Sequence, residues 1–135
     1  MRMPWKSGGG DSAPTSRVRM LEVAVPCRYY SRTRAFYEEG LGLPVEEAGN
    51  NHVFFDAGGG ARIAIVNAEE GDSLVKPTGH GMYLDLAADD LVAVKRRLID
   101  LGVRLLDERS NEYGKAITVH DPESNIVNIF QEGTF

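Results

Sequence analysis

The sequence predicts an α+β protein of two tandem βαβββ modules, whose strands form a curved mixed sheet around a cleft. The predicted elements occur in the order strand, helix, strand, strand, strand, and this order occurs twice. Each predicted helix ends near a Leu-Gly pair, at 41–42 and 101–102, and an apolar strand follows directly. The repeat of about 55 to 60 residues has the length of one supersecondary unit, which indicates a duplication.

The first module begins with an apolar strand at residues 18–25, which is interrupted by Glu22 and ended by Pro26. Ser31 is expected to cap the helix that follows, whose body covers residues 32–39. Three more strands, separated by turn signals, are predicted at residues 43–47, 52–56 and 61–67.

The second module begins with a strand at residues 81–87 and continues with a helix capped by Asp89 or Asp90. The apolar positions of this helix recur at helical spacing up to Leu101, so we expect one of its faces to cover a sheet. A polar turn precedes the last strand, and Asp121 is expected to bond the backbone there. The three remaining strands are predicted at residues 103–108, 115–120 and 126–131.

These elements define the expected domain organisation. Residues 1–16 are rich in Gly, Ser and Pro and are predicted to form a flexible tail. A single domain then covers residues 17–135. Within it, module one spans about residues 18–67, a polar linker spans 68–79 and module two spans about 80–132.

The composition argues against several classes of protein. A net charge of −5 disfavours a nucleic-acid partner, which requires clustered Lys and Arg side chains. Cys27 is the one cysteine, so an internal disulfide is excluded and a cytoplasmic location is expected. No apolar run reaches the roughly 18 residues of a membrane span. A small molecule is therefore the expected partner.

Two motifs, in this order and at this distance, carry a resemblance to a known group. Residues 34–43 read Arg-Ala-Phe-Tyr-Glu-Glu-Gly-Leu-Gly-Leu, after Val-Ala-Val-Pro at 23–26, and residues 121–129 read Asp-Pro-Glu-Ser-Asn-Ile-Val-Asn-Ile. The chain resembles the vicinal oxygen chelate superfamily of glyoxalases, bleomycin resistance proteins and dioxygenases. The resemblance covers about residues 18–131 and implies two βαβββ modules and, usually, a homodimer.

The resemblance also implies where a divalent metal would bind. Enzymes of this superfamily hold it with two His and one Glu, at positions that correspond here to Glu22, Gly81 and Asn128. Glycine has no side chain and an amide oxygen is a weak ligand, so no metal cofactor is favoured. The alternative is an atypical Zn, Ni, Fe or Mn site of Glu22, His80 and Asn128, which requires a β-bulge at His80.

Strand parity places a set of polar and aromatic side chains in the cleft. Glu22 has three roles open to it: pairing with an internal cation such as Arg62, binding a ligand, or acting as a general base. Asp85 either extends an acidic cleft or bonds a side chain of a neighbouring strand. For each aromatic residue, packing in the core is the alternative to lining the cleft. The expected ligand-binding residues are Glu22, Phe55, Tyr83, Asp85, Thr118, Asn128 and Phe130.

The favoured function is metal-independent binding of a small molecule, for sequestration or sensing, as the resemblance to bleomycin resistance proteins implies. A partly acidic, aromatic cleft suits a cationic or aromatic ligand. The alternative is a glyoxalase-like or dioxygenase-like lyase, isomerase or oxidoreductase that uses the atypical metal site or Glu22 as base. A structural module, with a cleft filled by its own side chains, is the third hypothesis.

Overall fold

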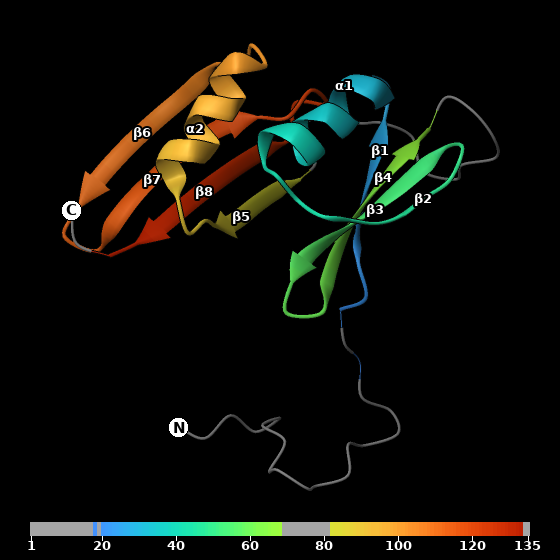
Figure 1. The fold of residues 1–135 in the computed structure, drawn as a ribbon, viewed down its shortest axis with the longest axis horizontal. Coiled ribbons are helices and arrows are strands. Elements are labelled where there is room, and N and C mark those ends of the chain that lie inside the picture. The colour runs from blue at the N-terminus through green and yellow to red at the C-terminus, as the bar shows by residue number, and fades with distance from the viewer. Residues whose placement is uncertain (1–17, 19, 69–81, 134–135) are drawn as a thin grey trace, which may run out of the picture.

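The computed structural model describes residues 18, 20–68 and 82–133, which form two four-stranded sheets (Figure 1). Both sheets have the same plan: the first strand of the module pairs in parallel with the last, and the other neighbours pair antiparallel. The predicted α+β class and duplication are therefore confirmed. The first sheet has the order β1 (Val23–Cys27), β4 (Ala61–Asn67), β3 (His52–Gly58), β2 (Val45–Ala48). The second has the order β5 (Tyr83–Ala87), β8 (Ile126–Glu132), β7 (Gly114–His120), β6 (Leu105–Asn111).

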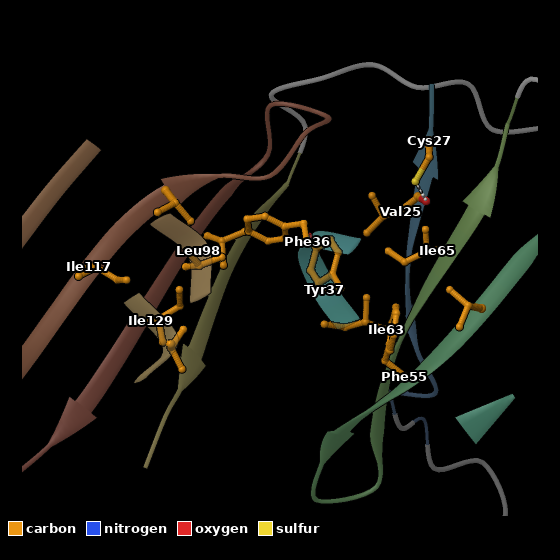
Figure 2. Packing of buried hydrophobic residues seen from close by; sticks show 14 of the residues in the cluster. Val25, Cys27, Phe36, Tyr37, Phe55, Ile63, Ile65, Leu98, Ile117 and Ile129 are labelled. Atoms are coloured by element: carbon orange, nitrogen blue, oxygen red, sulfur yellow. Dashed lines mark hydrogen bonds between the residues drawn. The ribbon is translucent and has the colours of Figure 1, made fainter. Parts of the chain in front are cut away.

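The two modules share one hydrophobic core through their helices. Helix α1 (Tyr30–Ala35) continues into a π-helical segment, η1 (Phe36–Gly40), and α2 (Leu91–Asp100) is the counterpart in the second module. Side chains of both helical segments lie between those of the two sheets (Figure 2). Gly40 permits the close approach, because a Cβ atom at this position would lie 2.7 Å from Leu98 Cδ2. None of the helices in the described part of the chain has the length and apolar character of a membrane span.

The first strand differs from its predicted position. It begins at Val23 and continues through Pro26 to Cys27, whereas the sequence predicted residues 18–25 with Pro26 as the end. Strand β1 is at the edge of its sheet, with β4 as its one neighbour. An edge strand tolerates proline, because the missing N–H can face away from the neighbouring strand.

The turn before β8 holds a carboxylate at the contact between the modules. Asp121 is buried, and its Oδ1 accepts the backbone N–H groups of Glu123 and Asn125 at 2.9 and 2.8 Å. Its Oδ2 accepts the Tyr37 hydroxyl at 2.7 Å and the Asn125 side-chain amide at 3.0 Å. Burial, and then the charge of Asp121, raise the pKa of the Tyr37 phenol well above 10.0. The predicted bonding of this turn to its own backbone is confirmed.

The N-terminus of α1 is capped by the second module. The buried carboxylate of Glu123 accepts the backbone N–H groups of Arg28 at 2.9 Å and Tyr29 at 2.6 Å, and the hydroxyl of Thr33 at 3.0 Å. The expected cap, Ser31, instead lies inside the helix and is exposed. In α2, by contrast, Asp90, one of the two predicted caps, caps the helix and accepts the N–H of Ala93 at 3.1 Å.

Candidate functional site

Each sheet has one face against the helices and one open face. On β5, Leu84 and Leu86 pack toward the core, whereas Tyr83 and Asp85 are exposed on the opposite face. The register of the second sheet pairs Asp85 with Asn128, and Asn128 with Thr118, so these side chains share the open face. Five predicted ligand-binding residues are thus on one surface: Tyr83, Asp85, Thr118, Asn128 and Phe130.

A chain of hydrogen bonds crosses the open face of the second sheet. Asn128 Nδ2 donates to Asp85 Oδ1 at 3.0 Å, and the Thr118 hydroxyl donates to Asn128 Oδ1 at 2.5 Å. Arg109 donates to the Thr118 hydroxyl at 3.1 Å and forms an ion pair with Asp107, whose pKa it lowers. The bonded side chains come from all four strands of the sheet. Of the two roles open to Asp85, bonding to a neighbouring strand is the one observed.

Two aromatic side chains are exposed beside these hydrogen-bonded residues. Tyr83 is 63% and Phe130 39% exposed. The Phe130 ring lies over Gly114 of β7, where a Cβ atom would be 3.0 Å from the ring. The depression between these groups has a volume of about 380 Å³, within the roughly 300–1,000 Å³ of small-molecule sites. Its lining residues all belong to the second sheet: Tyr83, Asp85, Leu86, Arg109, Ala116, Asn128 and Phe130.

The open face of the first sheet carries an ion pair stacked on an aromatic ring. Arg62 Nε donates to Glu22 Oε1 at 2.8 Å, and the guanidinium carbon lies 4.2 Å from the centre of the Phe54 ring. The His52 ring lies 4.8 Å from the same ring. Of the three roles open to Glu22, pairing with Arg62 is the one observed. Glu22 and Asp85 lie on different modules, and each of these bonds is made within its own module.

The predicted placement of Phe55 in the cleft is wrong. Its side chain is fully buried, and its ring centre lies 6.4 Å from that of Tyr37 in the core. The neighbouring Phe54 lies on the open face instead. Because a strand has a period of two, an error of one residue moves a side chain to the opposite face.

The residues at two of the superfamily's metal positions do not fit a metal ion. The Glu22 carboxylate bonds Arg62, and the amide of Asn128 is engaged by Thr118 and Asp85. His80, the remaining member of the alternative metal site, and Gly81 lie outside the described residues. Within residues 18, 20–68 and 82–133, no group of three His, Cys, Asp or Glu side chains is arranged to hold a metal.

Arg109 is a site residue that the sequence did not predict. It lies on the open face because β6 has an irregular register with β7 between Leu105 and Asp107. Counting alternate residues from the apolar start of the strand therefore fails beyond this point. The nearby Asp107 was the available signal, since charges of opposite sign two residues apart lie on the same face of a strand.

Two modules, each with parallel first and last strands, define the vicinal oxygen chelate fold. The family model described as "Glyoxalase-like domain" matches residues 22–130. The chain therefore belongs to this glyoxalase-like family of the vicinal oxygen chelate superfamily. No curated protein matches the sequence.

Several solved structures are similar to the chain in fold. An antibiotic-binding protein from a Streptomyces species shares 18% identity, with a TM-score of 0.63 over 89% of this chain and 100% of that one. A lactoylglutathione lyase from Agrobacterium tumefaciens shares 18%, with a TM-score of 0.59 over 86% and 95%. The fosfomycin resistance protein FosX from Mesorhizobium loti shares 18%, with a TM-score of 0.59 over 87% and 93%. At this identity the similarity shows the fold.

Proposed function

We propose that the chain binds a small molecule on the open face of the second sheet, without a metal, for sequestration or sensing. The observation that supports this is the depression in which the exposed rings of Tyr83 and Phe130 accompany the carboxylate of Asp85. Aromatic surface with a few fixed polar groups is the usual composition of a small-molecule site. The name of the antibiotic-binding neighbour is consistent with this function.

The expected ligand carries an aromatic ring and an amine or other cationic group. Asp85 is exposed, and Asn128 bonds its Oδ1, so its Oδ2 is left to accept a hydrogen bond from a ligand. A carboxylate accepts hydrogen bonds and favours a positive charge, while Tyr83 and Phe130 offer ring faces for stacking. The net charge of −5 adds a weak attraction for cations.

The proposed ligand-binding form is a cytoplasmic homodimer in which a partner chain covers the open faces. Tyr83 and Phe130 are large and exposed, as are Met20 at 69% and Leu21 at 64%, which precede β1. Strands β1 and β5 are both edges of their sheets. Exposed apolar side chains beside a strand edge are typical of a surface that another chain covers. Light scattering during gel filtration should give twice the monomer mass.

The metal-independent part of the proposal is tested by metal analysis. The purified protein is measured for Zn, Ni, Fe and Mn, and each metal is then titrated back by calorimetry. We expect substoichiometric content and no saturable binding. Stoichiometric binding that is lost in Glu22→Ala would overturn the metal-free function and favour the enzyme hypothesis, in which Glu22 leaves Arg62.

The ligand site is tested by a thermal-shift screen of aromatic amines against the purified protein. A ligand at a hundred times its Kd adds about 2.7 kcal/mol to the stability, which is readily detected. Tyr83→Ala and Asp85→Ala should each weaken binding of the hits about tenfold or more. Tyr113→Ala and Asp89→Ala are matched controls, because both residues are exposed outside the depression. Hits that bind both site variants normally would overturn the assignment.

A further inference from the structure

A second cavity lies between the two modules, on the helical side of the sheets. It has a volume of about 380 Å³ and is lined by α1 and the start of η1, by the segment from the end of α2 into β6, and by the end of β7 with the turn before β8. None of its lining residues lines the depression on the second sheet. The cavity is therefore separate from the site of the proposed function.

Two arginines at this cavity have no acidic partner in the described part of the chain. Arg32 of α1 and Arg104 before β6 both line the cavity and are exposed. The ion pairs found among the described residues use other cations. The Arg32 guanidinium lies 5.4 Å from the centre of the Tyr29 ring, which orients the group without neutralising it. In a chain of net charge −5, two guanidinium groups at one cavity, neither ion-paired within the described residues, are a notable concentration of positive charge.

The acidic group at the cavity forms no ion pair with these arginines. Asp121 lines the cavity, but it is 3% exposed, and each of its carboxylate oxygens accepts two hydrogen bonds from Tyr37 and the turn. Its lone pairs are therefore directed into the protein. His120 and Pro122 line the same side of the cavity.

The rest of the lining is apolar. Ala35 contributes from the end of α1 and Phe36 from the start of η1, and Leu101, Val103 and Leu106 contribute from the second module. An apolar wall beside fixed guanidinium groups suits a molecule with a hydrocarbon body and an anionic head, because arginine binds carboxylate and phosphate oxygens in a paired geometry.

We propose that this cavity is a second binding site, for a small organic anion with an apolar body. The anionic head, a carboxylate or a phosphate, bonds Arg32 and Arg104, and the body lies against Ala35, Val103 and Leu106. Because the cavity is formed by both modules, its occupant stabilises their contact. This inference is independent of the proposed ligand on the second sheet.

The probes for this site are 2-naphthoate and 2-naphthyl phosphate, with the neutral 2-naphthamide as the comparison. Titrations are followed by the backbone amide signals of the ¹⁵N-labelled full chain and by calorimetry. We expect saturable binding of at least one anion, with shifts at Ala35, Val103 and Leu106, and binding of the amide at least about tenfold weaker. The anion should also bind more weakly at high salt.

Variants separate this site from the other one. Arg32→Ala and Arg104→Ala should each weaken anion binding by about tenfold, as expected for the loss of a charged hydrogen bond. Arg96→Ala is the matched control, since Arg96 is an exposed arginine that does not line the cavity. Asp85→Ala should leave anion binding unchanged. The proposal is overturned if neither anion saturates, if the amide binds equally well, or if the two arginine variants bind as the wild type does.

Discussion

Replacing Glu123 with alanine tests directly how the second module holds the first. The carboxylate accepts three hydrogen bonds, from the backbone N–H groups of Arg28 and Tyr29 and from the hydroxyl of Thr33. A hydrogen bond to a charged group contributes about 1.5–3 kcal/mol. Two of the donors are only partly buried and can bond water in the variant. The summed loss for the three hydrogen bonds therefore falls toward the low end of that range. We expect a loss of about 4 kcal/mol, a large part of the roughly 5–15 kcal/mol that stabilises a domain.

Urea unfolding followed by circular dichroism measures this loss. Glu123→Gln keeps one carbonyl oxygen as acceptor and should lose about half as much as Glu123→Ala, or about 2 kcal/mol. Glu112→Ala, at an exposed turn between β6 and β7, is the control and should stay within about 0.5 kcal/mol of the wild type. A loss below about 1 kcal/mol in Glu123→Ala would refute the conclusion that this carboxylate joins the modules.

Three further changes probe buried positions of the first module. Gly40→Ala should destabilise the protein by about 1–3 kcal/mol in urea unfolding, because its Cβ would meet the fully buried side chain of Leu98, which has little room to move. Tyr37→Phe should cost about 1–3 kcal/mol by the same assay, since Asp121 loses a buried hydrogen bond. Burial, and then nearby negative charge, raise the pKa of the Cys27 thiol from 9.0 to about 12. The native thiol should therefore resist a thiol reagent at pH 8 that modifies it in urea. Since the unfolded thiol ionises first, this group should leave the stability unchanged below about pH 9 and lower it between pH 9 and 12, and Cys27→Ala should remove that part of the fall.

The fold was predictable because its signals are local and occur twice. Residues 61–67 form a strand with the predicted limits, and Asp90 caps α2 as its sequence position indicates. The cap of α1 was not predictable in the same way. Glu123 lies about ninety residues from the N–H groups it accepts, so no local pattern links them. Pro26 ended the predicted strand because the sequence does not reveal that β1 is an edge strand.

The shared face of the candidate residues on β5 and β8 was predictable, because the register of these two strands is regular. A polar residue between apolar ones marked Asp85 and Asn128, and the structure pairs them across β5 and β8. On the first sheet two adjacent phenylalanines gave no such contrast, so Phe55 was placed on the face that Phe54 occupies. The choice between them depends on the register with β4, which is a tertiary property.

Asn128 shows why a position in a family motif does not by itself carry the chemistry of the family. A carboxylate at this place would stand about as close to Asp85 as the amide does, at 3.0 Å, and two charged carboxylates so close require a metal or a shared proton. An amide needs neither, because it donates to Asp85 and accepts from Thr118 at once. Asp85 and Asn128 therefore bond each other directly, with no need of an ion between them. It also leaves a fixed, exposed carboxylate beside Tyr83 and Phe130, where the positive charge of a ligand can compensate it.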